Sequence, residues 1–351
     1  MPPLFLAQSI ISEVPKANPL IGFLPTLTML FRSQIMNHVN VVNMGMRIFT
    51  FAAFCIFFTN ISFAGSWQSF RIEGAQDTYI TSIENSLLVG FYNTSANPRF
   101  ITQGFSLNES SVNFPINYPS AGYTRLLGTD GVNIVGYYND GVQGFLYDGN
   151  TWTSYSSPWP LFFGNQGFYF KDISNGKIIG NYYSESSSNP QIGLIRSFTF
   201  TPSNNSWEIL TGPNNEMDWI RANGIDGNRI IGNFGSEGFL FDGVTWETLS
   251  SPWVNSTFVD ISGNNIVGNA GSHGFVFDGN SWDTIQYPDS TSTVITAISG
   301  NTIVGYYSTG DGFNNGFIHT IPEPSSLLLL LGIGIPLTLR LLKPKFTKRE
   351  F

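Results

Sequence analysis

The sequence predicts an all-β protein, a six-bladed β-propeller of four-stranded repeats that is closed by its N-terminal strand. Two short motifs recur along the chain about once every 40 residues. The 351 residues include 37 Gly and 31 Phe, and only 11% are charged, which is typical of short strands joined by tight turns. The apolar residues are frequent and periodic, so a disordered chain is excluded.

The first motif is an apolar pair followed by glycine, as in GNNIVGNA from Gly263 to Ala270. A β-branched or aromatic run precedes each copy, and an Asn/Gly-containing turn joins the two, which predicts a hairpin. Successive copies are 46, 44, 52, 36 and 37 residues apart. The shared glycines are Gly90, Gly136, Gly180, Gly232, Gly268 and Gly305.

The second motif supplies the other two strands of each repeat, as in GFVFDGNSW from Gly274 to Trp282. Clear copies lie at 144–152 and 238–246, and the third repeat has the degenerate version RSFTFTPSNNSW from Arg196 to Trp207. The Asp-Gly pair predicts a turn between two strands, and the second of these strands begins with Trp.

The loop lengths predict how the strands lie in a blade. A Pro-containing loop such as 251–257 leads to the next repeat, so the Trp strand is outermost and the run before Ile-Val-Gly is innermost. The last repeat has no Trp strand, whereas a lone Trp strand opens the domain at 66–72. Joining them completes a sixth blade and a domain over 65–320. A β-solenoid or a tandem sandwich is the alternative.

Charge and cysteine content exclude several kinds of protein. Residues 65–321 contain 21 acidic and 8 basic residues, so nucleic acid is not an expected partner. Cys55 is the single cysteine, so one chain can form neither a disulfide nor a cysteine-based metal site. We expect no cofactor, because no phosphate loop, nucleophile elbow or zinc-protease motif is present.

The recurring polar residues have structural explanations. Asp148, Asp242 and Asp278 belong to Asp-Gly turns, and each offers a single carboxylate where calcium needs several oxygen ligands. His273 and His319 lie a full repeat apart, which makes a zinc site improbable. We therefore expect no catalytic residue and no metal site.

Tryptophan outside the repeated position is the best indication of a ligand. Trp159 and Trp253 each follow Ser-Ser-Pro in a loop between repeats, so we interpret them as the candidate ligand rim. Paired carboxylates for glycan cleavage remain open, because nothing in the sequence singles out two of the acidic residues.

The N-terminal part has the pattern of a secretory signal peptide over 46–64. Arg47 precedes an apolar run from Ile48 to Phe58, and cleavage is expected between Ala64 and Gly65. Residues 1–45 lack periodicity, so we interpret them as an unstructured leader, and our hypothesis is that translation begins at Met36, Met44 or Met46 and leaves the leader untranslated.

The C-terminal part, 321–351, combines three features in a fixed order. Pro322, Glu323 and Pro324 come first, an apolar helix of 13 residues follows from Leu327 to Leu339, and a basic cluster ends the chain. After a signal peptide, this order predicts a transmembrane helix with its basic end in the cytoplasm. An ordinary C-terminal anchor is the alternative.

This arrangement closely resembles the PEP-CTERM sorting signal of exported proteins of Gram-negative bacteria. The resemblance implies processing by a membrane-bound exosortase and release to the cell surface or matrix, often in an exopolysaccharide or biofilm context. The Gly-Phe and Ile-Val-Gly motifs also resemble HAF-type repeats of exported proteins.

These observations lead us to expect a non-enzymatic surface or matrix protein that binds polysaccharide or protein partners. The alternative is a secreted glycan-active enzyme with carboxylates at the propeller channel. A passive structural coat protein is a third interpretation.

Overall fold

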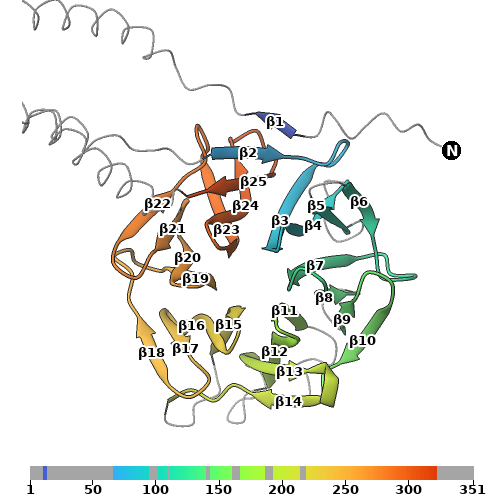
Figure 1. The fold of residues 1–351 in the computed structure, drawn as a ribbon, viewed down its shortest axis with the longest axis vertical. Coiled ribbons are helices and arrows are strands. Elements are labelled where there is room, and N and C mark those ends of the chain that lie inside the picture. The colour runs from blue at the N-terminus through green and yellow to red at the C-terminus, as the bar shows by residue number, and fades with distance from the viewer. Residues whose placement is uncertain are drawn as a thin grey trace, which may run out of the picture. The chain divides into compact units, whose positions relative to one another are not determined.

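A computed structural model shows a ring of six antiparallel sheets, so the predicted six-bladed β-propeller is confirmed and the solenoid and sandwich alternatives are wrong (Figure 1). The structure describes residues 11–13, 66–94, 102–108, 111–139, 143–159, 167–185, 193–213 and 219–321. These residues contain no α-helix, and Pro202–Asn204 form a 3-10 turn. In this part of the chain no helix is both long and apolar enough to cross a membrane.

Each blade has four strands. Blade 1 comprises β3 (Asp77–Glu84), β4 (Leu87–Asn93), β5 (Thr102–Asn108) and β6 (Ser111–Ile116). Blade 2 comprises β7 (Thr124–Thr129), β8 (Ile134–Tyr138), β9 (Gln143–Tyr147) and β10 (Trp152–Ser156). Blade 3 comprises β11 (Phe168–Ser174), β12 (Lys177–Glu185), β13 (Gly193–Thr201) and β14 (Ser206–Ile209).

The second half of the ring repeats this arrangement. Blade 4 comprises β15 (Ile220–Asp226), β16 (Arg229–Phe234), β17 (Glu237–Phe241) and β18 (Trp246–Leu249). Blade 5 comprises β19 (Thr257–Ser262), β20 (Asn265–Ala270), β21 (His273–Phe277) and β22 (Trp282–Ile285). Blade 6 comprises β23 (Ser292–Ser299), β24 (Thr302–Ser308), β25 (Asn315–Thr320) and β2 (Ser66–Phe70).

The N-terminal strand closes the ring, as the sequence predicts. Strand β2 pairs antiparallel with β25, from Ser66 opposite Thr320 to Phe70 opposite Gly316. A three-residue strand, β1 (Ile11–Glu13), pairs with the other edge of β2 as a fifth strand of this sheet. The closure satisfies the edge of β25 that would otherwise lack a partner.

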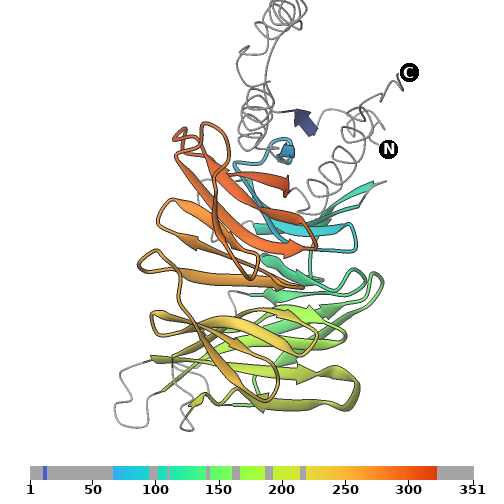
Figure 2. The ribbon, with the colours of Figure 1, turned by 60° about the vertical axis from the view of Figure 1, so that its left-hand side comes forward.

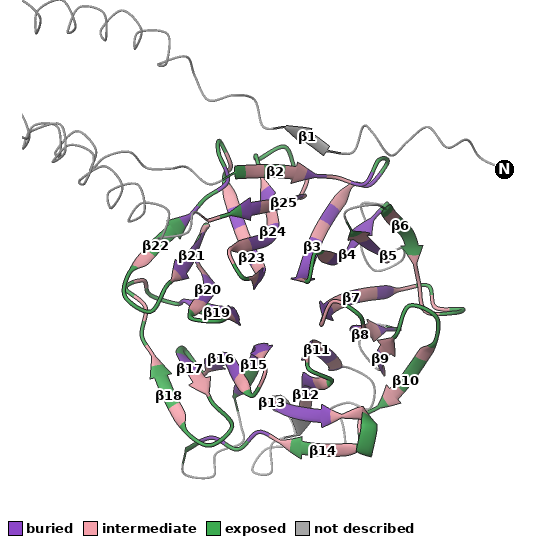
Figure 3. Cartoon of the chain, viewed as in Figure 1, coloured by how far each residue is buried: buried purple, intermediate pink, exposed green. Residues whose placement is uncertain are grey.

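The inner and outer strands also lie where the sequence predicts. The runs that precede the Ile-Val-Gly motif face the channel, and the Trp strands form the rim (Figure 1). Burial follows the same order, because exposed residues concentrate on the outermost strands and on the turns (Figure 3). Seen from the side, the blades overlap in succession around the ring, and their turns project from both faces (Figure 2).

The two motifs recur because they pack on each other within a blade. The motif glycine lies opposite the phenylalanine of the Gly-Phe motif, as Gly268 lies opposite Phe275. A Cβ atom on Gly268 would lie 2.3 Å from the Thr257 carbonyl oxygen and 2.4 Å from the Phe275 ring. Only glycine lets the ring cover the strand at this distance.

The glycine of the Gly-Phe motif makes room for a side chain of the next blade. A Cβ atom on Gly238 would lie 2.2 Å from the Phe258 ring of the next blade. In the degenerate third repeat this position is Ser197, and the residue that faces it in the next blade is the small Ala222. The Ser197 hydroxyl donates to the Ile220 carbonyl and accepts from the Ala222 N–H, at 2.8 and 2.7 Å. The larger side chain is thus matched by a smaller one.

The repeated tryptophans pack on the aromatic residue across the Asp-Gly turn. Trp246 stacks on Phe241 with ring centroids 4.6 Å apart, and Trp282 stacks on Phe277 at 4.4 Å. The same pairing is made by Trp152 with Tyr147 and by Trp207 with Phe200. These rings cover the outer side of blades 2 to 5.

A substitution of the motif glycine tests the packing within a blade. We expect Gly268→Ala to lower the free energy of unfolding by about 2 kcal/mol, because its methyl group overlaps both a backbone carbonyl and a buried ring. Gly122→Ala is the matched control, since a Cβ atom there has no neighbour within 4 Å. Thermal unfolding measures both variants, and equal midpoints would contradict this account of the repeat.

Candidate functional site at the channel mouth

The two tryptophans expected at a ligand rim pack against their blades. Trp159 stacks on Tyr182 with ring centroids 4.9 Å apart, and Trp253 stacks on Phe275 at 5.4 Å. Both rings are half-buried and belong to the packing of blades 3 and 5. Their Ser-Ser-Pro loops are held locally, for example by the Ser251 hydroxyl, which donates to the Trp253 carbonyl at 2.9 Å.

The turn aspartates use their carboxylates within the turn. Asp148 Oδ1 accepts from the N–H groups of Asn150 and Thr151 at 2.8 and 2.7 Å, and Asp242 and Asp278 repeat the arrangement. These N–H donors lower the pKa of all three carboxyls.

The two histidines lie in different blades. His319 stacks on Trp67 with ring centroids 3.9 Å apart, at the closure of the ring, whereas His273 contacts the edge of Trp253. Among the residues that the structure describes, no group of three or more His, Cys, Asp or Glu is placed to hold a metal ion.

The remaining predicted functional residues lie outside the described part of the chain. They are the cleavage residues Ala64 and Gly65 and the sorting motif Pro322, Glu323 and Pro324. The predicted signal peptide over 46–64 and the predicted membrane helix within 321–351 also fall there.

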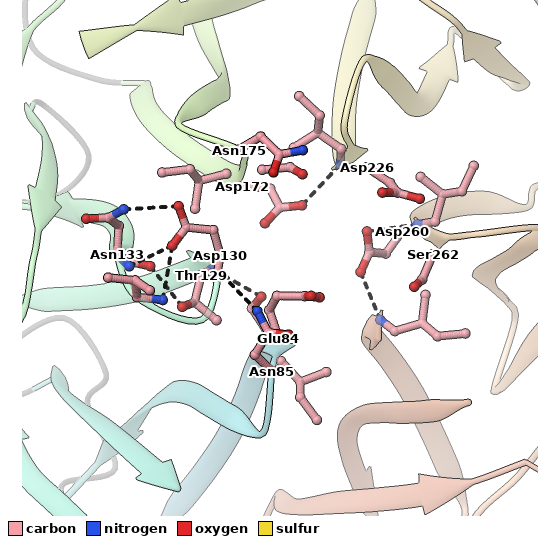
Figure 4. A pocket seen from close by; sticks show the side chains of 18 of the residues that line it. Glu84, Asn85, Thr129, Asp130, Asn133, Asp172, Asn175, Asp226, Asp260 and Ser262 are labelled. Atoms are coloured by element: carbon pink, nitrogen blue, oxygen red, sulfur yellow. Dashed lines mark hydrogen bonds between the residues drawn. The ribbon is translucent and has the colours of Figure 1, made fainter. Parts of the chain in front are cut away.

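A cavity of about 400 Å³ opens where the inner strands end at one mouth of the channel (Figure 4). Its walls are the last residues of the six inner strands and several of the turns that follow them. Five acidic residues from five blades line it, which are Glu84, Asp130, Asp172, Asp226 and Asp260. The sequence does not show this gathering, because only closure of the ring brings these turns together.

A bulge in each inner strand creates the positions that face this mouth. The register shifts by one residue in all six inner strands, for example between Phe258 and Asp260 in β19. Bulges redirect a side chain and commonly occur beside functional sites. The residues directly after the bulge are Ser82, Gly128, Asp172, Gly224, Asp260 and Ala297.

The two aspartates of this set occupy space left by glycine in the preceding blade. A Cβ atom on Gly128 would lie 2.7 Å from Asp172 Oδ1, and one on Gly224 would lie 2.4 Å from Asp260 Oδ1. The alternation of Gly and Asp around the ring therefore makes room for two carboxyl groups. One short pattern in the sequence accompanies these two carboxyl groups. The tripeptide Asp-Ile-Ser occurs at Asp172 and again at Asp260.

Each of these aspartates also links its blade to the next. Asp172 Oδ2 accepts from the Ile225 N–H of blade 4 at 3.1 Å. Asp260 Oδ2 accepts from the Ile298 N–H of blade 6 at 2.8 Å. The second oxygen of Asp260 accepts from the adjacent Ile261 N–H at 2.8 Å.

The surroundings of the pair favour protonated carboxyl groups. Burial raises the pKa of Asp172 to about 7, with a further rise from the negative charge of Glu84, although the nearby Lys171 lowers it. Burial and the negative charge of Asp172 raise the pKa of Asp260 well above its usual range. One mouth of the channel therefore presents carboxyl groups that hold protons near neutral pH.

The other three acidic residues at the mouth differ in their hydrogen-bond and ion-pair partners. The Asp130 carboxylate accepts from the backbone and side chain of Asn133, and Asp226 pairs with Arg229. Glu84 ends the inner strand of blade 1 and lies in the same cavity as Asp172 (Figure 4). The Asp172 carboxyl, whose pKa is raised, therefore shares one cavity with a second acidic side chain, and acid–base chemistry uses such a pair of carboxyl groups.

No family model matches the chain, and a search of curated proteins also finds no match. Several solved structures are similar to this chain. The chain aligns with an acylaminoacyl peptidase of Pyrococcus horikoshii at 11% identity and a TM-score of 0.43, over 71% of this chain and 46% of that one. It thus spans about half the length of that peptidase.

Two similar structures are enzymes that act on sugars. One is a sialidase of Trypanosoma rangeli, with 12% identity, a TM-score of 0.44 and coverage of 75% of this chain and 57% of that one. The other is an oligogalacturonate lyase in complex with manganese, with 10% identity, a TM-score of 0.40 and coverage of 74% and 97%. These enzymes contradict the expectation that the protein is not an enzyme, and we correct it. At this level the likeness is one of fold and assigns no activity.

The raised pKa values predict a pH dependence of stability. Between the ordinary value of 3.8 and about 7, the folded protein keeps a proton on Asp172 that the unfolded chain loses. This group's contribution to the free energy of unfolding therefore decreases as pH rises through that window. We expect Asp172→Asn to lose less stability than the wild type between pH 5 and pH 8.

Thermal unfolding at the two pH values measures this difference. Asp148→Asn is the control, because the pKa of Asp148 is lowered and the group titrates below the window. Equal pH dependence in wild type and Asp172→Asn would show that Asp172 is ionised in the folded protein.

Proposed function

We propose that this protein is an exported enzyme that hydrolyses glycosidic bonds at the channel mouth lined by Asp172 and Glu84. The observation that carries the proposal is that Asp172, whose carboxyl is buried and has a raised pKa, lines one cavity together with Glu84. Asp172 gives its proton to the glycosidic oxygen as the bond to the anomeric carbon breaks. Water adds to that carbon, and its proton passes to Glu84.

The charge of the cavity selects the substrate class. Five acidic side chains line the mouth, so it disfavours a polysaccharide that carries carboxylates. A neutral polysaccharide, or one that contains amino sugars, is favoured. We therefore propose a neutral or amino-substituted exopolysaccharide as the substrate.

Substitution of each carboxyl tests this mechanism. We expect Asp172→Asn and Glu84→Gln each to lower the rate of reducing-sugar release by about 100-fold or more, because each removes one proton-transfer step. The wild-type activity should fall as pH rises above about 7, where Asp172 loses its proton. The assay uses β-glucan and chitosan, with alginate as the acidic comparison.

Asp148→Asn is the matched control, since this exposed turn carboxyl lies outside the cavity. It should retain full activity. The mechanism is wrong if no polysaccharide is cleaved, or if cleavage continues unchanged in both cavity variants.

The proposed location follows from the two ends of the sequence. The signal peptide pattern over 46–64 and the Pro322-Glu323-Pro324 motif support export, membrane insertion and processing by an exosortase, with release at the cell surface or into the matrix. Changing all three motif residues to Ala should leave the unprocessed protein in the membrane. Cell fractionation with immunoblotting measures this, and unchanged size and location would overturn the sorting proposal.

A further inference from the structure

A second cavity of about 400 Å³ lies at the opposite ends of two inner strands from the acidic mouth. The acidic mouth receives the last residues of β15 and β19, whereas this cavity is lined by their first residues and by adjacent turns. Its described lining includes one cation, Arg221, and neither Asp nor Glu. Among the residues that the structure describes, the linings of the two cavities therefore differ in the sign of their charged side chains.

Trp219 is the exposed aromatic residue of this cavity. Its surface is 53% exposed, whereas the other seven tryptophans are half-buried in blade packing. Its backbone φ is +66°, a left-handed conformation that a large side chain rarely adopts. Such strain persists where the surrounding structure enforces it, and it is common at ligand sites.

Two hydrogen bonds enforce the position of Trp219. Its N–H donates to the Ile195 carbonyl at 2.8 Å, and its own carbonyl accepts from the Gly235 N–H at 3.2 Å. The backbone is thus fixed between β13 and the turn after β16. The indole is held at the edge of the cavity even though it remains exposed to solvent.

Arg221 brings a positive charge to the same cavity. It is two residues beyond Trp219 and is exposed, and its Nη2 atom donates to the Tyr183 hydroxyl at 3.4 Å. This long hydrogen bond orients the guanidinium while leaving most of its donors for a ligand. Ser236, which is also exposed, adds a hydroxyl group to the lining.

We infer that this cavity binds a saccharide that carries a carboxylate. The Trp219 ring offers a face of partial negative charge, on which the C–H groups of a sugar ring can stack. Arg221 offers paired N–H donors that match a carboxylate, and hydroxyl and amide groups around them suit sugar hydroxyls. The inference rests on this cavity alone and is independent of hydrolysis at the acidic mouth.

Binding of a matched pair of ligands to the full-length protein tests the inference. The β-1,4-linked trimer of mannuronate carries three carboxylates, and β-1,4-mannotriose has the same linkage without them. Titration calorimetry should show that the mannuronate trimer binds at least tenfold more tightly, because a charged hydrogen-bonded contact is lost with the neutral sugar.

Variants separate the two contacts. Trp219→Ala should weaken both ligands by about tenfold, since both lose the stacking surface. Arg221→Gln should weaken the mannuronate trimer alone, and Arg221→Lys should restore part of the preference. Val244→Ala, at an exposed position outside the cavity, is the control, and circular dichroism checks that each variant is folded.

Three results would overturn the inference. One is equal affinity for the two trimers, and another is unchanged binding in both Trp219→Ala and Arg221→Gln. The third is tighter binding of a triglutamate peptide than of the mannuronate trimer, which would identify an acidic peptide site instead. Hydrolysis of neutral glycans by Trp219→Ala tests the acidic mouth separately, so either proposal can fail alone.

Discussion

The ring depends on hydrogen bonds from the side chains of one blade to the inner strand of the next. The Thr81 hydroxyl donates to the Leu126 carbonyl at 2.8 Å, and the Asn269 amide both accepts from and donates to the backbone of Ile295. These groups are largely buried, and an unsatisfied buried polar group costs about 1–3 kcal/mol. Apolar contacts between blades tolerate sliding, but directional bonds of this kind fix how far each blade is rotated against its neighbour.

The carboxyl groups of the candidate site belong to this same set of bonds. Asp172 and Asp260 each hold a backbone N–H of the next blade and also line the acidic mouth. Their positions are therefore as rigid as the ring itself, which is what acid–base chemistry requires of a proton donor. The burial that raises their pKa values lowers stability near neutral pH, so the site and the fold impose opposing demands on the same residues.

Much of the fold could be predicted because each repeat encodes its own packing. The motif glycines and the phenylalanines that cover them recur at matched positions, and the lone strand at Trp67 shows how the ring closes. The candidate site could not be predicted in the same way. A bulge of one residue decides that Asp172 faces the channel, and the repeated tripeptide Asp-Ile-Ser is too short to predict that bulge from the sequence. Trp219 also lies outside the repeated tryptophan position, but the sequence does not show that it is exposed, because its exposure depends on a strained backbone that neighbouring strands hold in place.

The closure of blade 6 has a consequence for the order of folding. Ser66 and Thr320 are partners in one sheet although the whole ring separates them along the chain. A chain that crosses a membrane from its N-terminus delivers β2 first and β25 last, so β2 waits without its partner until the other five blades have emerged. The edge of β2 is exposed to other chains during this interval. Pairing of β2 with β25 is therefore the last step of ring closure, and a chaperone that covers β2 would protect this edge until then.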